Sequence, residues 1–444
     1  MLALAAPSAL VSALRTAQAL TDQAVIGHLA YHGESTAVYL DAAALALLWQ
    51  QLTIQVANRA LGGAVNVLSS QAIGAGNTKL ADVWLLLGGL LLAPIVGLAV
   101  IGLWLLTGDV VGLFASNQTL GAADADHGPG DPVDLAAEYA RLSVGYVIPT
   151  LWMECLNQWL LAQRVIRPQL VVYTAAFALN LGLNVLLVHG WAAVGFDGLG
   201  FVGSPLATTL TRVAQLLGLL LALPACSLRL RHLRVRDVFE RGRLRTFTAQ
   251  MCPRIASATL EEIALQFVGA LAGRLGAVPT ATHNAMLMAF FWLTSPMYGV
   301  GTAAQQRMGH YLGAGRPQAA RRVAGLCFLI DMGLCLTMAS IMMLTREEIG
   351  RIFSSSAAII SMAAKLTPLV AAAYCLVGIF YSSMAVLNGQ GRPVPVMIAF
   401  LIGAFAISPS LGYALTFTAI DCCDFGDGVL PLCVLPSLPL LKLP

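Results

Sequence analysis

Charged side chains are scarce in this chain. Asp, Glu, Lys and Arg make up 11% of the 444 residues, whereas hydrophobic residues make up 58%. Soluble domains carry charge on about a quarter of their residues, so the composition excludes an ordinary soluble protein and indicates a lipid bilayer as the solvent. The net charge is only +3, and the arginines lie in short clusters between apolar runs. The sequence therefore lacks the continuous basic face that nucleic-acid binding requires.

Cysteine motifs are also missing. The nine cysteines include no Cys-x-x-Cys pair, and several lie within apolar runs, where cysteine behaves as a small hydrophobe. No Gly-x-Ser-x-Gly motif is present to supply a nucleophilic serine. We therefore expect no disulfide framework, no metal and no cofactor. An intramembrane enzyme is the least favoured class of function.

The two halves of the chain share landmarks. Three residues of the first apolar run recur 246 positions later, namely Pro7, Gly27 and Leu29 as Pro253, Gly273 and Leu275. A Gly-Ala-Gly triplet at residues 74–76 recurs at residues 313–315. Two related halves with a binding site between them are typical of secondary transporters. The sequence thus predicts a duplicated membrane protein.

Eleven apolar runs are long enough to cross a bilayer, since a spanning helix needs about 20 such residues. They cover residues 7–29, 37–66, 81–107, 138–162, 169–190, 199–226, 252–273, 281–306, 322–344, 363–388 and 394–418. We predict an all-α membrane protein with two pseudo-symmetric six-helix lobes, whose twelfth helix is missing or irregular. The expected parts are an N-lobe with helices 1–6 (1–228), an arginine-rich cytoplasmic linker (229–250), a C-lobe with helices 7–11 (251–418) and an irregular, proline-rich tail (419–444).

Acidic residues inside the predicted spans are candidate functional sites, because burying a charge in a membrane is costly. Asp22 lies in the first helix, and Glu261 lies beside Glu262 in the corresponding helix of the second half. In the 246-residue register Asp22 aligns with Val268, so the two acids are not copies of each other. We expect Glu261 to be the main proton-coupling residue and Asp22 a secondary one. The alternative is that each acid pairs with a basic neighbour or reaches the membrane interface.

Other polar residues lie within the spans. Glu154 and Asp331 are further buried acids by these boundaries. Asn180 and Asn184 lie one turn apart, hence on one face of the predicted fifth helix. Amides in such a position either contact a ligand or ion, or join helices by hydrogen bonds. Both interpretations stay open at this point.

Several motifs together resemble the multidrug and toxic compound extrusion (MATE) family. They are Pro7 to Asp22 with Gly27-His28-Leu29, Ser-Gln-Ala-Ile-Gly-Ala-Gly-Asn at 70–77, Gln163 to Pro168, Pro253 to Glu261, and Gly-His-Tyr-Leu-Gly-Ala-Gly-Arg-Pro at 309–317. The resemblance implies a two-lobed antiporter that expels organic, often cationic, compounds in exchange for protons or sodium. It extends over nearly the whole chain to about residue 418.

The resemblance also implies roles for individual residues. Asp22 matches the helix 1 acid of bacterial members, and Glu261 matches the helix 7 acid of plant and animal members. Asn180 matches an asparagine of the bacterial cation site, whereas Asn184 stands where an aspartate is common. Gln266 stands where a second glutamate often follows the helix 7 acid, and we include it among the substrate or ion contacts.

The expected function is therefore cation-coupled export of organic compounds or xenobiotics by alternating access, most readily driven by protons. The expected partners are small organic substrates, a proton or sodium ion, and the lipid bilayer, with no nucleic acid. The protein is expected to be a multi-pass membrane protein of the plasma membrane or an organelle. The alternatives are a flippase for lipid-linked precursors with similar lobes and a degenerate paralogue that does not transport.

The distribution of charge between the spans predicts the membrane topology, because cytoplasmic loops carry the excess of Lys and Arg. Every second loop is basic, with Lys79, Arg164, the 229–250 linker, Arg316 and Arg392, whereas the 121–134 loop is acidic. In a cysteine-free background, Ala125→Cys should react with an impermeant maleimide on intact cells. Gly242→Cys should react only after permeabilisation. The reverse labelling pattern would contradict this topology.

Overall fold

The protein is seen in a computed structural model that describes residues 2–26, 36–110, 132–191, 195–223, 238–353, 356–407 and 410. Its regular elements within these ranges are helices, and the one β-bridge, between Trp191 and Phe196, is isolated. This confirms the predicted all-α fold. The predicted tail at 419–444, and with it any twelfth helix, lies outside the described residues.

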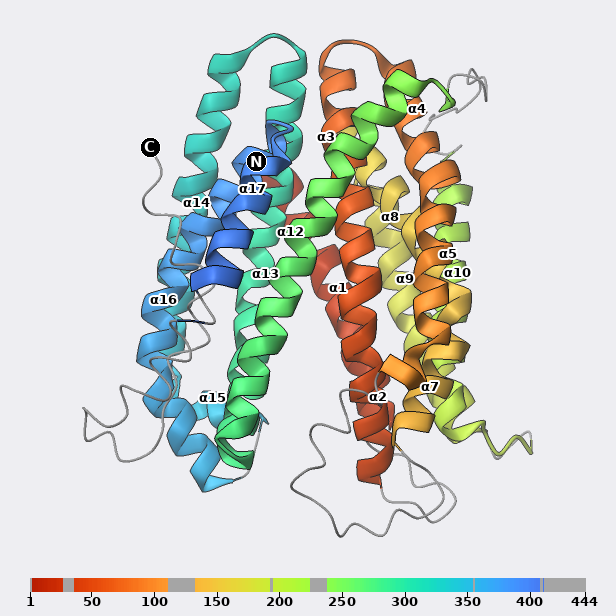
Figure 1. The fold of residues 1–444 in the computed structure, drawn as a ribbon, viewed down its shortest axis with the longest axis vertical. Helices are drawn as coiled ribbons and strands as arrows, with labels where there is room; N and C mark the ends of the chain where they lie inside the picture. Colours follow the sequence, from red (N-terminus) through yellow and green to blue (C-terminus); the bar gives the residue numbers. More distant parts are fainter. Residues whose placement is uncertain are drawn as a thin grey trace. The chain divides into compact units, whose positions relative to one another are not determined.

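The chain forms two compact units. We call Leu10–Ser69 with Asn77–Phe247 the N-unit, and Met1–Ala9 with Ser70–Gly76 and Thr248–Pro444 the C-unit. The limits predicted above for the lobes, the linker and the tail stay predictions. The helices appear in chain order from red to blue in Figure 1.

The first half of the chain contains the predicted spans 1 to 6 as helices, several of them interrupted by a π or 3₁₀ turn. In order they are α1 (Leu2–Ile26), α2 (Thr36–Gln50), α3 (Val56–Gly74), α4 (Thr78–Leu86), α5 (Ala93–Leu105), α7 (Pro132–Ser143), α8 (Val147–Ala162), α9 (Arg167–Asn184) and α10 (Gly203–Ala222). A π turn at Gln51–Gln55 joins α2 to α3, and another at Leu87–Leu92 joins α4 to α5. The helices α2 and α3 together therefore form the predicted span 37–66, and α4 and α5 together form the span 81–107.

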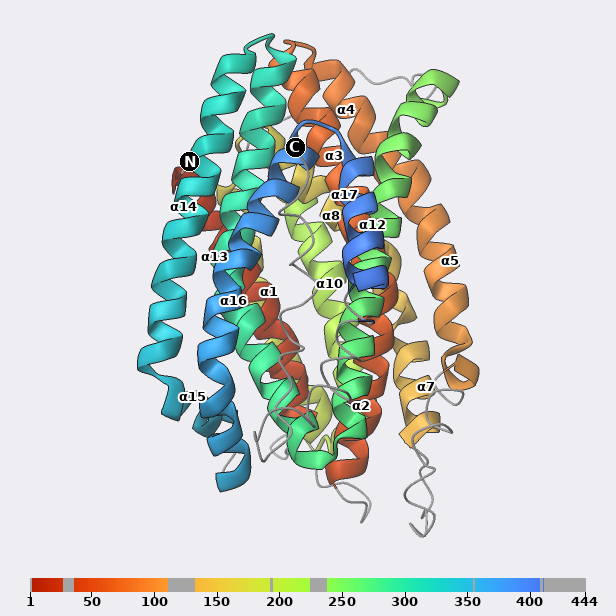
Figure 2. The same ribbon diagram turned by 60° about the vertical axis from the view of Figure 1, so that its left-hand side comes forward.

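The described part of the second half contains four long helices and two short ones, α15 and α17, of eight residues each. They are α12 (Arg241–Arg274), α13 (Ala277–Gly313), α14 (Pro317–Leu344), α15 (Arg346–Phe353), α16 (Ala357–Gly389) and α17 (Pro393–Phe400). Within the C-unit, α13, α14 and α16 pack against one another, and they lie side by side in both views (Figure 1, Figure 2). Gly378 of α16 lies in this packing, because a Cβ there would collide with the Cys335 sulfur of α14.

Five helices of the described residues are long and apolar enough to span a membrane by themselves. They are Thr78–Leu105, Arg167–His189, Gly200–Ala222, Pro317–Leu344 and Ala357–Gly389. Large apolar side chains on them are exposed, including Leu98 at 63% and Leu221 at 79%. Such surfaces are suited to lipid rather than water. The protein is therefore a multi-pass integral membrane protein, as its composition predicts.

Four tight turns between helices share one backbone conformation. Gly76, Gly315 and Gly391 have φ of 77°, 68° and 74°, and Arg164 has φ of 62°. The turns at Gly76 and Gly315 also have matching hydrogen bonds, from Ala75 N to Gln71 O and from Ala314 N to His310 O, both 3.0 Å long. Left-handed residues commonly end helices in this way, and glycine adopts the conformation without strain. The sequence repeat is thus reproduced as a repeated turn.

These turns allow a clean test of backbone strain. A Cβ at Gly315 would meet no atom within 4 Å, so Gly315→Ala should lower stability only through its φ, by about 1 kcal/mol. Arg164→Gly should relieve the same strain and raise the unfolding temperature. Thermal unfolding in detergent measures both effects. Gly102→Ala is the matched control, because Gly102 has equally open surroundings inside α5 and should gain helix stability. A stabilising Gly315→Ala would contradict the prediction.

Candidate functional site

Asp22 lies at the centre of a polar site in the N-unit. Its side chain on α1 is 7% exposed. Asn180 Nδ2 and Asn184 Nδ2 of α9 donate to Asp22 Oδ1 at 3.2 and 2.7 Å, and Thr208 Oγ1 of α10 donates to Asp22 Oδ2 at 2.8 Å. The structure therefore brings together the acid and the two asparagines that the sequence selected separately. We call these four residues the Asp22 site.

The polar groups of the Asp22 site can stabilise the carboxylate both when it is ionised and when a cation neutralises it. Its three donors suit the ionised form, because hydrogen bonds to a charged acceptor are the strong ones. Among the described residues, the amide oxygens of Asn180 and Asn184 are buried without a hydrogen-bond partner. An unmade hydrogen bond of this kind costs about 1–3 kcal/mol. Because an amide group carries both donors and an acceptor, rotation of either amide would turn an oxygen toward a cation at Asp22.

Thr208 was not among the residues predicted from sequence. It lies in an apolar helix next to Thr209, whose hydroxyl donates to the backbone oxygen of Pro205. Threonines in helices commonly bond the preceding turn in this way. Nothing in the sequence distinguishes the two, and only the contact with Asp22 marks Thr208 as part of the site.

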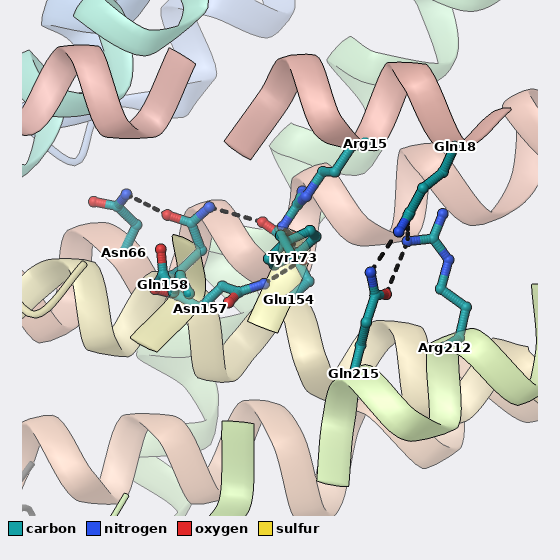
Figure 3. Close-up of polar contacts among 10 residues, drawn as sticks. Arg15, Gln18, Asn66, Glu154, Asn157, Gln158, Tyr173, Arg212 and Gln215 are labelled. Atoms are coloured by element: carbon teal, nitrogen blue, oxygen red, sulfur yellow. Dashed lines mark hydrogen bonds and ion pairs between the residues drawn. The ribbon is translucent and has the colours of Figure 1, made fainter. Parts of the chain in front are cut away.

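Glu154 belongs to a second polar cluster of the N-unit, drawn in Figure 3. Its carboxylate forms an ion pair with Arg15 of α1, with 2.8 Å between Oε2 and Nη2. Arg15 also donates to the hydroxyl of Tyr173, which accepts a second hydrogen bond from Asn157, each 2.7 Å long. Arg15 thus pairs with Glu154, and the cluster joins α1, α8 and α9. This geometry favours a role in helix packing for Glu154.

Glu261 lies in a different chemical setting, in the C-unit. The half-buried side chain on α12 accepts a long hydrogen bond of 3.5 Å from the hydroxyl of Tyr381 on α16. Tyr298 of α13 donates to Tyr381 at 2.9 Å, and the two ring centroids lie 5.0 Å apart. Sequence analysis missed both tyrosines, because aromatic residues are common in apolar helices. A carboxylate beside aromatic rings is suited to an organic cation, which binds the faces of such rings.

Gln266 and Asp331, which the sequence also selected, are not among the residues that contact Asp22, Glu154 or Glu261 in the hydrogen bonds described above. Gln266 is half-buried on α12, and five residues separate it from Glu261, whereas three or four would make the side chains neighbours. Its role as a contact residue stays a prediction. Asp331 of α14 is 1% exposed and accepts hydrogen bonds from Ser382 Oγ at 2.6 Å and Cys327 Sγ at 3.4 Å. It therefore links α14 to α16.

The chemistry available at these positions is that of carboxylates, amides, hydroxyls and aromatic rings. Within the part of the chain that the structure describes, no group of three or more His, Cys, Asp and Glu residues could hold a metal ion. The Asp22 site can bind a proton or a small monovalent cation. Glu261 with Tyr298 and Tyr381, which we call the Glu261 cluster, is chemically suited to a proton or an organic cation.

Known proteins resemble this chain in sequence and in fold. The chain is 25% identical over 434 residues to the multidrug resistance protein PmpM of Pseudomonas aeruginosa. This match covers 94% of this chain and 84% of PmpM. It is 25% identical over 423 residues to human multidrug and toxin extrusion protein 1, covering 94% of this chain and 69% of the human protein. The crystal structure of the eukaryotic MATE transporter AtDTX14 superposes with a TM-score of 0.83 at 20% identity, over 98% of this chain and 92% of that one.

The family model gives the assignment. The MatE model matches residues 7–186 and 253–414, which include every residue of the Asp22 site except Thr208, and the whole Glu261 cluster. One matched range lies in each half of the chain. The chain therefore belongs to the MatE family of membrane transporters.

Proposed function

We propose that this protein exports small organic compounds from one side of the membrane in exchange for a coupling cation, most readily the proton. The observation that carries the proposal is the Asp22 site, a carboxylate buried in a membrane helix and surrounded by groups that can adapt to its charge. The names of the curated relatives, which describe multidrug resistance and toxin extrusion, support export.

Coupling at Asp22 follows from the cost of burying its charge. The ionised carboxylate needs its three hydrogen-bond donors, which hold α9 and α10 against α1. Binding of a proton or cation neutralises the charge and weakens that requirement. A ligand can shift a conformational equilibrium only if its affinity differs between the two states, and the helix contacts at Asp22 supply such a difference. Alternating access of the two units would then follow the charge of this side chain.

Asn184 limits the charge that the Asp22 site can bind. With an amide at this position, Asp22 is the site's one formal negative charge. One proton or one monovalent cation neutralises it. We therefore propose that this site contributes to coupling but is secondary to Glu261.

Glu261 is proposed as the main coupling residue. Its half-buried carboxylate lies beside Tyr298 and Tyr381, so a proton and an organic cation can compete for one place. Protonation removes the charge that attracts a cationic substrate and permits its release. Loss of the proton restores binding. This competition is the reciprocal coupling that an exchanger requires.

Transport by purified protein in liposomes tests this proposal. We expect Glu261→Gln to abolish uphill accumulation of an aromatic organic cation under an imposed pH gradient, because glutamine keeps the size of the side chain but does not titrate. Asp22→Asn should cause a smaller loss. The matched control is Glu262→Gln on a different face of α12, which should transport normally. If accumulation driven by the pH gradient survives Glu261→Gln but not Asp22→Asn, then Asp22 and not Glu261 is the main coupling residue. Accumulation under a sodium gradient alone would identify sodium, and not the proton, as the coupling ion.

The Asn180 amide gives a further test of the N-unit. Asn180→Ala removes one of the three donors that stabilise ionised Asp22, so the carboxylate should take up the coupling proton more readily. The apparent half-saturation for the proton should fall by about tenfold or more, since one such hydrogen bond to a charged group contributes about 1.5–3 kcal/mol. The amount of folded protein should stay unchanged. Thr174→Ala on the exposed side of the same helix is the matched control. Loss of folded protein with unchanged transport per molecule would instead assign Asn180 to helix packing.

A further inference from the structure

Arg212 of α10 lies next to the Asp22 site, although the proposed function gives it no role. It is one turn beyond Thr208, which bonds the Asp22 carboxylate. Its Nη1 donates to Gln18 Oε1 and to Gln215 Oε1, each at 3.1 Å. Gln18 in turn lies one turn before Asp22 on α1. Arg212 is therefore connected to the site through both helices that carry it.

The position of Arg212 is set by buried groups rather than by the membrane surface. The residue is midway along α10 (Gly203–Ala222), where a charged side chain is costly in a bilayer. Gln18 and Gln215 are 2% and 0% exposed, and Gln215 Nε2 also donates to Gln18 Oε1 at 3.3 Å. Figure 3 shows the two amides converging on the guanidinium. This arrangement holds a positive charge at a defined place inside the N-unit.

Asp22 is the carboxylate that this positive charge acts on. The acid of the neighbouring cluster, Glu154, is already paired with Arg15 at 2.8 Å. Two described phenols near the site, those of Tyr139 and Tyr146, are neutral near pH 7. Arg212 is linked to Asp22 by position, since it lies one turn from Thr208, which bonds the carboxylate, and donates to Gln18, one turn before Asp22. The formal charges of ionised Asp22 and Arg212 therefore cancel.

We propose that Arg212 is a tethered counter-cation of Asp22 that opposes the binding of a free cation, and so makes the Asp22 site selective for the proton over sodium. The proposal rests on the coupling role proposed for Asp22. Arg212 lies one helical turn from Thr208, which bonds the carboxylate, and charges interact over such separations in a protein interior, so the guanidinium weakens the attraction of the carboxylate for any cation. A proton still binds, because it forms a covalent O–H bond. Sodium depends on electrostatic attraction and oxygen ligands alone, so it loses its binding at physiological concentration.

Binding of sodium to the purified protein tests the proposal without any transport assay. Thermal unfolding in detergent is compared in sodium chloride and in choline chloride of equal ionic strength, since a ligand that binds only the folded state raises its stability. Wild-type protein should show no sodium-specific shift. Arg212→Gln should show one, with an apparent sodium affinity at least about tenfold higher, as expected for removal of a nearby like charge. Arg212→Lys, which keeps the charge, should behave as the wild type.

A double variant assigns the effect to the site. The sodium-specific shift of Arg212→Gln should disappear in Asp22→Asn/Arg212→Gln. If the shift persists there, or if the wild type already shows the same sodium affinity as Arg212→Gln, the proposal is overturned. Should Arg212→Gln not fold, Arg212→Met removes the same charge and keeps an apolar stem. Failure of both to fold, with Arg212→Lys folded, would make the charge structural and also overturn the proposal.

The outcome is separable from that of the proposed transport function. If Arg212→Gln binds sodium through Asp22 while liposomes show no pH-driven export, the counter-cation role stands and the transport proposal falls. If export depends on Glu261 and Asp22 but sodium affinity is unaffected by Arg212→Gln, the transport proposal stands and this inference falls.

Discussion

The N-unit depends on the burial of one negative charge, that of Asp22. A carboxylate removed from water is very costly unless hydrogen bonds or a counter-charge compensate it. Here the compensating donors come from α9 and α10, at 2.7 to 3.2 Å, so the charge itself holds α1 against these helices. Any change in the charge alters the relative stability of this packing.

The two copies of the sequence repeat share backbone geometry but not chemistry. The turns at Gly76 and Gly315 have the same left-handed conformation and equivalent hydrogen bonds, because both halves need a helix to end there. The acids differ, however. In the register of the repeat, Glu261 of the second half corresponds to Arg15 of the first, and Arg15 forms an ion pair with Glu154. Equivalent positions of the two halves thus carry opposite charges.

Amides determine how the N-unit responds to charge. A carboxylate at position 184 would add a second negative charge, whereas Asn184 adds a donor that bonds ionised Asp22 at 2.7 Å and an acceptor that can face a cation. Gln18 and Gln215 act in the same way toward Arg212, using their oxygens to hold a positive charge. The N-unit therefore holds both signs of charge with neutral side chains. In the C-unit, aromatic rings accompany the carboxylate of Glu261 instead.

The sequence by itself determined the helical membrane fold, the repeat, the tight glycine turns and the identity of the buried acids. These are local properties, because the length of an apolar run and the preference of glycine for positive φ act over a few neighbouring residues. Only the tertiary structure decided which residues meet. The partners of Asp22 are 158 to 186 positions away in the chain, and helical spacing shows which side chains share a face but not which helix that face contacts. For the same reason Thr208, Tyr298 and Tyr381 could not be selected from sequence, and Glu154 could not be matched to Arg15 until the helices were packed.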